Sequence, residues 1–397
     1  MLEEIAQRTG IETIPESWTA NWPGFAESRP CDGFSLESAV ECAGLMDLPV
    51  ESLPPFQEAI RLVRGNPDLR RLAEFWHHLI CHIPGTGDNP SNWPNPQVMG
   101  PVAVMFPLVA LASGMKHSLD LYAELRTPDD TVRATMADIG LWVRQYHLKH
   151  GVWGLGELVW LRKHARARIF IVGRLQYVPT TFRWQFQVFR NKLTGEVVPL
   201  CESGLEFRAD GLPQGTNGIS DPNPWVSEFS HDGEWISGSP VNTVGAASRQ
   251  RVRLSARKWE QILAPGMDTL DVHIPRSGKM PVTESLESFR LAREFFAEYF
   301  PDRRFAAFTC QSWMLDPNLQ SILPAESNLA QFQRLWRLVS VPGNESSAFV
   351  FVFGDRTVDL STAPRDTSLR RAILDWLLAG NHMRGAAGFV LIEDEMV

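Results

Sequence analysis

The chain has 397 residues, of which 44% are hydrophobic and 21% charged, and its formal net charge is −8 at pH 7. This composition is typical of a globular protein with a full core, and the length favours two domains. The negative charge speaks against nucleic-acid binding, which needs a basic face. Five cysteines without a C-x-x-C pair, and an N-terminus without a basic and then apolar segment, predict a cytoplasmic protein with no disulfide framework and no secretory signal.

Residues 1–165 carry the period of amphipathic helices, which predicts a helical N-terminal domain. Ser35 is a candidate cap for a helix from Leu36. Further helices are predicted over Pro54–Val63, Pro67–Ile83, Val102–Met115, Leu119–Leu125 and Thr131–His147. The most apolar stretch, Val98–Met115, is interrupted by Gly100, Pro101 and Pro107. We therefore expect a buried helix there and no membrane contact.

Four potential metal ligands lie close together in this region, namely His77, His78, Cys81 and His82. On a helix, residues four apart share a face, which is metal-ligand spacing. However, no nearby carboxylate or second Cys/His pair completes a tetrahedral site. We therefore predict no metal and interpret the cluster as a partly buried helix with aromatic and imidazole side chains.

From about residue 167 the period changes to two, which is typical of strands. Arg168–Val178, Trp184–Arg190 and Val197–Leu200 predict an antiparallel meander. Residues 202–248 are rich in Gly, Pro, Ser and Asp and predict a long loop insertion, either an acceptor-binding lid or a solvent-exposed segment. After the insertion, we expect a short strand over Val252–Leu254 and a short helix over Ala256–Leu263.

The stretch Thr269–Asp316 predicts a strand, a basic loop, a helix and a second strand. Leu270, Val272 and Ile274 alternate with polar residues, as in a strand, and Phe305–Cys310 is the second strand. The helix is predicted to start at Thr283, whose hydroxyl can cap free amides. Two strands joined by one helix should lie parallel with a right-handed crossover. The loop between them then opens at the carboxyl edge of the sheet, where open α/β folds bind ligands.

This loop, Pro275–Pro281, combines several features of an anion site. Free amides at the helix start, the helix dipole, Arg276 and Lys279 converge there, with Gly278 between Ser277 and Lys279. The combination favours a phosphate or pyrophosphate. The alternative is an ordinary strand-to-helix turn with two solvated basic residues.

The remaining chain predicts helices and strands in turn. Asp316-Pro317 predicts the cap and start of a short helix to Leu323, and Ser327 is a candidate cap for a helix over Asn328–Trp336. Strands are predicted over Leu338–Val341, Ala348–Phe353 and Phe389–Ile392, and a helix over Thr367–Ala379. Ala348–Phe353 is nearly all apolar, so we expect it to be a central strand.

Four blocks of this sequence resemble those of a bacterial acyltransferase family. They are GRLQY (Gly173–Tyr177), HIPRSGKM (His273–Met280), CQSWMLDP (Cys310–Pro317) and LPAESNLAQFQ (Leu323–Gln333). Members pair a helical N-terminal region with a C-terminal domain like that of GNAT proteins, the superfamily of CoA-dependent N-acyltransferases. The resemblance implies a helical domain over residues 1–165 and, over 166–397, an α+β or α/β domain with a GNAT-like mixed sheet and flanking helices.

In the GNAT arrangement, acyl-CoA lies between two splayed parallel strands, with its pyrophosphate on the loop and helix start that join them. The resemblance therefore implies an N-acyltransferase that uses acyl-CoA, without a metal, and whose acceptor is a small-molecule or peptide amine that attacks the thioester directly. The usual loop signature, Gln or Arg followed by x-x-Gly-x-Gly/Ala, is absent, and only Arg276 and Gly278 stand in for it. The cofactor-binding residues expected are Ile274, Arg276, Ser277, Gly278, Lys279 and Thr283.

Acyl transfer to an amine needs a proton acceptor, because a lysine-like amine titrates near about 10.4, and it needs hydrogen-bond donors for the oxyanion. His273 is the preferred general base because an unperturbed histidine titrates near neutrality, and its strand lines the wedge in the GNAT arrangement. Asp271 shares its face and can assist or substitute. Ser312 is the candidate proton donor or positioning hydroxyl, and the substrate-binding candidates are Cys310, Trp313 and Asn328. A structural role is the alternative for each.

Two other functions stay open at this point. In one, Cys310 is a nucleophile activated by His273, which gives a ping-pong transferase or a thioester hydrolase. The apolar strand around Cys310 favours an inert thiol instead. In the other, the chain is a catalytically degenerate GNAT fold that binds acyl-CoA or a partner protein.

Overall fold

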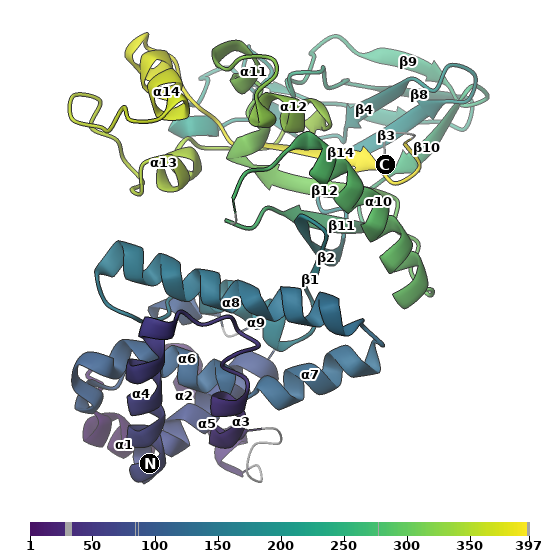
Figure 1. Cartoon of the computed structure of the whole chain (residues 1–397). Coiled ribbons are helices and arrows are strands. Elements are labelled where there is room, and N and C mark those ends of the chain that lie inside the picture. The colour runs from purple at the N-terminus through teal and green to yellow at the C-terminus, as the bar shows by residue number, and fades with distance from the viewer. Residues whose placement is uncertain (28–33, 84, 86, 277, 395–397) are drawn as a thin grey trace. The chain divides into compact units, whose positions relative to one another are not determined.

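Two compact units make up the chain, shown in Figure 1. The computed structural model describes residues 1–27, 34–83, 85, 87–276 and 278–394. One unit comprises Met1–Ile171 with Pro275–Ser277, and the other comprises Val172–Ile274 with Gly278–Val397. The predicted boundary after residue 165 falls at the end of the last helix of the first unit, α9 (Leu158–Ala165).

The first unit is helical, as predicted. Its other helices are α1 (Leu2–Thr9), α2 (Glu16–Glu27), α3 (Leu36–Glu41), α4 (Leu53–Gly65), α5 (Pro67–Cys81), α6 (Phe106–Ala112), α7 (Met115–Glu124) and α8 (Asp129–His150), with 3₁₀ turns η1 (Val50–Ser52), η2 (Pro90–Asn92) and η3 (Gln97–Met105). Ser35 caps α3 by accepting a hydrogen bond from the Ser38 amide. The segment Gln97–Glu124 is long and apolar enough to cross a membrane, but 72% of its most apolar window is buried in the protein, as in a core segment.

A six-stranded mixed sheet forms the centre of the second unit. Its order is β1 (Phe170–Val172), β2 (Leu175–Thr181), β11 (Asp268–His273), β12 (Ala307–Ser312), β14 (Ala386–Leu391) and β13 (Arg337–Val339). β11 and β12 are parallel and are joined by helix α10 (Val282–Tyr299). β2 runs antiparallel to β11, and β14 runs antiparallel to β12 and β13. The predicted strand–loop–helix–strand element and its parallel strands are therefore confirmed.

Helix α10 packs on one face of this sheet through aromatic rings and one buried serine. Phe289 stacks on Phe308 of β12 with ring centroids 4.8 Å apart. Ser288 Oγ accepts a hydrogen bond from the Leu175 amide at 3.1 Å and lies 2.8 Å from the Tyr177 hydroxyl. Gly173 approaches so closely, with φ at +64°, that a Cβ there would lie 3.2 Å from Ser288 Cα. The block GRLQY therefore provides much of the surface on which α10 packs.

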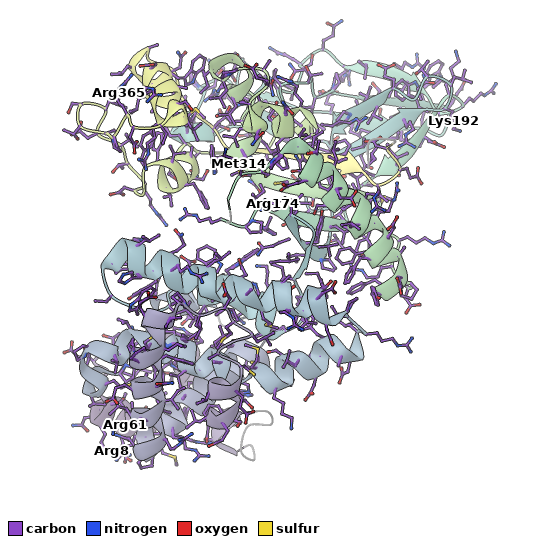
Figure 2. The ribbon with its side chains drawn as sticks, viewed as in Figure 1. Arg8, Arg61, Arg174, Lys192, Met314 and Arg365 are labelled. Carbon is purple, nitrogen blue, oxygen red and sulfur yellow. The ribbon has the colours of Figure 1, made fainter. Side chains whose placement is uncertain are left out.

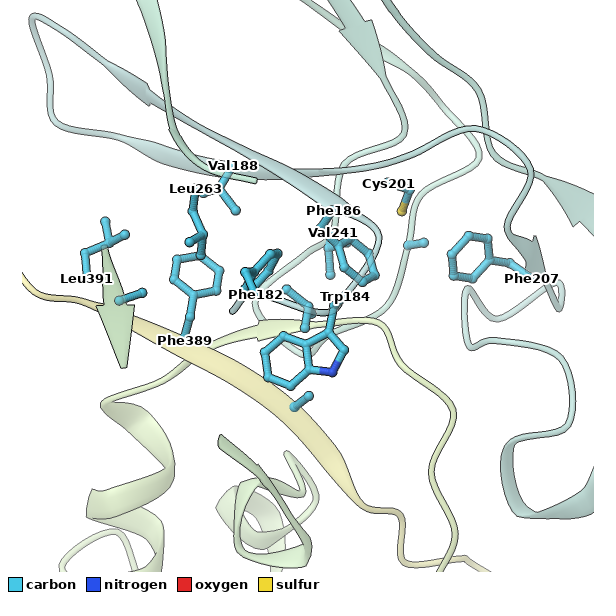
Figure 3. Packing of buried hydrophobic residues seen from close by; sticks show 14 of the residues in the cluster. Phe182, Trp184, Phe186, Val188, Cys201, Phe207, Val241, Leu263, Phe389 and Leu391 are labelled. Atoms are coloured by element: carbon cyan, nitrogen blue, oxygen red, sulfur yellow. The ribbon is translucent and has the colours of Figure 1, made fainter. Parts of the chain in front are cut away.

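A second sheet covers the opposite face of the first. It consists of β10 (Trp259–Leu263), β3 (Phe186–Asn191) and β4 (Val197–Cys201). Figure 3 shows Phe389 and Leu391 of β14 beside Phe182, Val188 and Leu263, in one buried cluster. The predicted single meander is therefore wrong, because β2 belongs to the first sheet while β3 and β4 belong to the second.

The insertion over residues 202–248 is less irregular than predicted. It contains β5 (Glu206–Phe207), β6 (Trp225–Val226), β7 (Phe229–His231) and β8 (Trp235–Gly238), and β8 also pairs with β9 (Val252–Ser255). Phe207 stacks on Trp225 at 4.8 Å. The helix predicted over Ala256–Leu263 is wrong, since strand β10 occupies that segment. Cross-strand pairing with β3 decides its conformation, and a short apolar window does not reveal such pairing.

The end of the chain adds a satellite helical cluster to the sheet. It contains η5 (Trp313–Leu315), α11 (Leu319–Ile322), α12 (Asn328–Arg334), α13 (Ser346–Val352) and α14 (Ser368–Leu378). Ser327 caps α12, as predicted, whereas Thr367, predicted as the first residue of a helix, is the N-cap of α14. The central strand predicted over Ala348–Phe353 is wrong, because α13 occupies it. A short apolar run does not distinguish a buried strand from a buried helix by its period.

Asp316 links the segment after β12 to the segment before β14 by hydrogen bonds. Its Oδ1 accepts a hydrogen bond from the Asn318 amide at 2.9 Å, and its Oδ2 accepts one from the Arg384 amide at 2.6 Å. The prediction that Asp316 caps a helix starting at Pro317 is wrong, because α11 begins at Leu319. Burial outweighs these hydrogen bonds and raises the pKa of Asp316 to about 6.

We expect Asp316 to make stability fall as pH rises. Its folded pKa lies above the unfolded value of about 3.9, so the folded protein holds the extra proton between these values. The stability that it contributes is thus fully present below about pH 4 and is lost as pH rises through about 6. Urea unfolding measures the free energy of unfolding of the wild type and of Asp316→Asn at each pH. The difference between the two proteins should change by about 2–3 kcal/mol over this window. A difference that does not depend on pH would contradict this assignment.

Candidate active site

The two parallel strands separate at their carboxyl ends. β11 and β12 pair only from Thr269 to Asp271 and from Ala307 to Thr309. Beyond these pairs, both strands continue without pairing with each other. On its outer edge, β11 stays paired with β2 as far as His273. On its own outer edge, β12 stays paired with β14 as far as Ser312. The gap therefore has two backbone edges that face each other and lack a strand partner.

The chain between β11 and α10 leads from this gap to a helix N-terminus. No side chain among the described residues caps the first turn of α10, whose N-cap residue is Pro281. Thr283 is exposed inside the helix, so its predicted role as the cap is wrong. Gly278 has φ at +66° and Lys279 is exposed. The half-buried Arg174, which is labelled in Figure 2, lies near this segment. Its Nε donates to the Lys279 carbonyl at 3.2 Å.

The loop is divided between the two units. Residues 275–277 group with the N-terminal unit, where Arg276 Nη1 donates to Gln145 Oε1 at 2.7 Å. Burial lowers the pKa of Arg276, against the opposing effect of the Glu157 charge. Ser277 lies outside the described residues, and Ile274 is half-buried just beyond β11. Lys279 and Gly278 belong to the second unit with the strands.

His273 and Asp271 lie together on the face of the sheet away from α10. Tyr177, which contacts α10 through Ser288, is opposite Val272, so the residues on either side of Val272 point to the other face. His273 Nε2 lies 3.3 Å from Asp271 Oδ2. The imidazole side chain is 33% exposed and the carboxylate 13% exposed. The structure thus places the predicted base beside its predicted partner at the gap.

Arg183 completes this polar group, and no sequence pattern predicted it. It lies between β2 and β3, with Nη1 3.3 Å from Asp271 Oδ2 and Nη2 3.5 Å from Gln311 Oε1. Thr309 also donates to Asp271 Oδ1, at 3.4 Å. Burial alone would raise the pKa of Asp271, but the hydrogen bond from His273 and the charges of His273 and Arg183 outweigh it, so the pKa is lowered. Asp271 is therefore ionised at neutral pH.

Most of the site residues predicted at the end of β12 make contacts within the protein or are buried in it. Ser312 Oγ accepts a hydrogen bond from the Met314 amide at 3.2 Å, which caps η5. Trp313 is buried in the satellite cluster, and Asn328 is half-buried in the first turn of α12. Cys310 is 2% exposed. Burial, followed by the charge of Asp271, raises its pKa well above the usual value, so the nucleophilic thiolate is disfavoured.

Among the described residues, no three His, Cys, Asp or Glu side chains are arranged to hold a metal ion. The cluster at the end of α5 consists of packed rings, with His77 and His82 centroids 5.5 Å apart and Cys81 Sγ 3.4 Å from His77 Nδ1.

Parallel strands that part beside a helix N-terminus define a GNAT-like fold. Residues 169–390 match the family model of the GNAT-like C-terminal domain, and residues 38–167 match that of the N-acyltransferase N-terminal domain. The chain therefore belongs to the family of N-acyltransferases with a GNAT-like C-terminal domain, and it is an acyltransferase.

Several solved structures share this fold. An acyltransferase in complex with decanoyl-CoA and teicoplanin has 22% identity and a TM-score of 0.67, covering 98% of this chain and 99% of that chain. An acyltransferase in complex with CoA and 10C-teicoplanin gives the same values. A mutant acyltransferase in complex with octanoyl-CoA has 22% identity and a TM-score of 0.66, with the same coverage. No curated protein matches the chain by sequence.

Proposed function

We propose that this protein transfers an acyl group from a CoA thioester to the amine of a small-molecule or peptide-like acceptor, by direct attack. The observation that carries the proposal is the gap between β11 and β12, which has a helix N-terminus at one end and the His273–Asp271 pair on one face. Structures of the same fold hold acyl-CoA and teicoplanin, which supports the same two classes of substrate here. A cytoplasmic location stays a prediction from the cysteine pattern.

The open edges of β11 and β12 suit the pantetheine arm of CoA. Its two amides can take the place of a missing strand and bond to the unpaired backbone groups of Val272–His273 and Cys310–Ser312. The pyrophosphate then reaches the start of α10, where free amides and the helix dipole favour negative charge. Lys279 adds a positive charge beside it, and Arg174 holds the Lys279 carbonyl.

The reaction needs one base on the face where His273 lies. The neutral amine nitrogen attacks the thioester carbonyl carbon, and the carbonyl electrons move onto oxygen. His273 takes a proton from the attacking nitrogen, and Asp271 stabilises the resulting imidazolium. The C–S bond then breaks as the carbonyl re-forms, and the CoA thiolate takes up a proton. The products are an amide and free CoA.

This function is tested by thiol release from acyl-CoAs of graded chain length, with and without a panel of amines. We expect release only in the presence of an amine, with one amide formed per thiol. Mass spectrometry of the enzyme with acyl-CoA alone should show no acyl adduct. An adduct at Cys310 would favour the ping-pong mechanism instead, and thiol release without an amine would favour a hydrolase.

Lys279→Ala is expected to weaken the binding of CoA about 3- to 10-fold, the usual range for one exposed charge contact with a phosphate. It should leave the binding of pantetheine unchanged, because pantetheine lacks the nucleotide and pyrophosphate. Isothermal titration calorimetry measures both. Lys192→Ala is the matched control, since Lys192 is an exposed lysine on the β3–β4 turn of the same unit. An equal effect of both substitutions, or none from Lys279→Ala, would remove the loop from the binding site.

A further inference from the structure

Gln176 is a buried polar residue beside His273 whose side-chain NH₂ group lacks a hydrogen-bond acceptor in the described part of the chain. It lies on β2 directly opposite His273 in the antiparallel ladder. Opposite residues point to the same face of a sheet, with Cβ atoms about 4.5–5.5 Å apart. Gln176 is 2% exposed, and its Nε2 has no hydrogen-bond acceptor among the residues that the structure describes.

A buried amide without a partner is costly, at about 1–3 kcal/mol, and native proteins contain few such groups. The other members of the block GRLQY have structural tasks. Gly173 makes room for Ser288, the Leu175 amide donates to Ser288, and the Tyr177 hydroxyl contacts Ser288. Within β2, Gln176 points to the opposite face from Leu175 and Tyr177, which is the face of His273. A partner that arrives with the substrate would explain it.

We propose that Gln176 is a catalytic residue whose Nε2 donates a hydrogen bond to the carbonyl oxygen of the thioester. This inference rests on the proposed function. The bond strengthens when the amine nitrogen attacks and negative charge moves onto that oxygen. When the C–S bond breaks, the electron pair leaves with sulfur, the oxygen becomes a neutral amide carbonyl and the bond weakens again. Gln176 itself gains and loses no proton.

The neighbouring groups on this face are occupied with other tasks. Asp271 is a carboxylate and can only accept hydrogen bonds. Arg183 already contacts Asp271 and Gln311. His273 must accept the proton of the amine in the proposed mechanism. The Gln176 amide is neutral, so it can stabilise the oxyanion without disfavouring the protonation of His273.

Gln176→Met tests this assignment, because methionine has a similar length and no donor. We expect kcat to fall about 10- to 100-fold, below the 10²–10³-fold known for a lost oxyanion donor, because backbone amides at the gap still contribute. The dissociation constant of acyl-CoA should change less than about twofold, since the lost bond matters most in the transition state. The melting temperature should stay the same or rise, because the unpaired amide is gone.

Thr269→Val is the matched control. Thr269 is fully buried on β11, its Oγ1 has no hydrogen-bond partner within the described part of the chain, and it lies four residues before His273. Valine there should keep or raise the melting temperature and leave kcat unchanged. Gln176→Glu is a second variant of the same shape, whose carboxylate repels the oxyanion, so its kcat should be at least as low as that of Gln176→Met.

The outcomes separate this inference from the function on which it rests. If the wild type transfers acyl groups and Gln176→Met keeps its kcat, the amide contacts only water and the proposal is wrong. A joint loss of kcat and melting temperature in Gln176→Met, with full kcat in Gln176→Glu, would assign a structural role. A wild type that releases no CoA with any amine refutes the proposed function itself.

Discussion

Replacing His273 with alanine is expected to lower kcat by about 10²–10⁴-fold, the usual contribution of a general base. The dissociation constant of acyl-CoA should stay nearly unchanged. The reason is geometric, since the imidazole lies on the face away from α10, whereas the proposed CoA contacts are the strand edges and the helix start. Without the imidazole, the attacking nitrogen must lose its proton to water.

Steady-state kinetics and calorimetry with acyl-CoA measure these two quantities separately. His231→Ala is the matched control, because His231 is an exposed histidine on β7 of the same unit. It should leave both quantities unchanged. If His273→Ala weakens the binding of acyl-CoA by as large a factor as it lowers kcat, His273 has a structural role.

Asp271→Asn is expected to lower kcat on the order of 10²-fold, which lies between the losses known for a triad aspartate and for a residue that orients a metal ligand. Asp271 orients the imidazole at 3.3 Å and stabilises its charged form. Asparagine keeps the shape but removes the charge. It can also present its NH₂ group to the imidazole and turn the ring or change its tautomer.

Arg183 provides the second half of this test. Arg183→Met should lower kcat less than Asp271→Asn, because it acts only through the carboxylate, and Arg183→Lys should restore part of the loss. The melting temperature should stay nearly unchanged in both variants, because the Arg183 side chain is 46% exposed. A joint fall of kcat and melting temperature in Arg183→Met, without recovery of kcat in Arg183→Lys, would show that Arg183 is merely structural.

The sequence predicted the elements whose pattern is local. The alternation of Leu270, Val272 and Ile274, the amphipathic period of α10 and the following strand together predicted a parallel pair, because a crossover helix allows little else. The resemblance of four blocks added the GNAT-like arrangement, and the family models confirm it. Capping by Ser35 and Ser327 was also predicted, since one polar residue before a helix carries that signal.

Contacts between distant segments were not predictable in the same way. Arg183 reaches Asp271 across 88 positions of sequence, and Gln176 meets His273 only because β2 pairs with β11 in one register. The same limit explains the errors in the fold. The segment Ala348–Phe353 became a helix and Trp259–Leu263 a strand, because tertiary packing decides the conformation of short apolar runs.

The most direct test of this account is a crystal structure with a non-hydrolysable acyl-CoA analogue. We expect the pantetheine arm between Val272–His273 and Cys310–Ser312, the pyrophosphate at the start of α10, and the acyl carbonyl oxygen within hydrogen-bond distance of Gln176 Nε2. A groove of about 610 Å³ beside β4 and β13, lined by Pro199, Asn242 and Trp336 among others, is the rival location in the same unit. Density for the pantetheine arm in that groove, with the gap between β11 and β12 empty, would contradict the account.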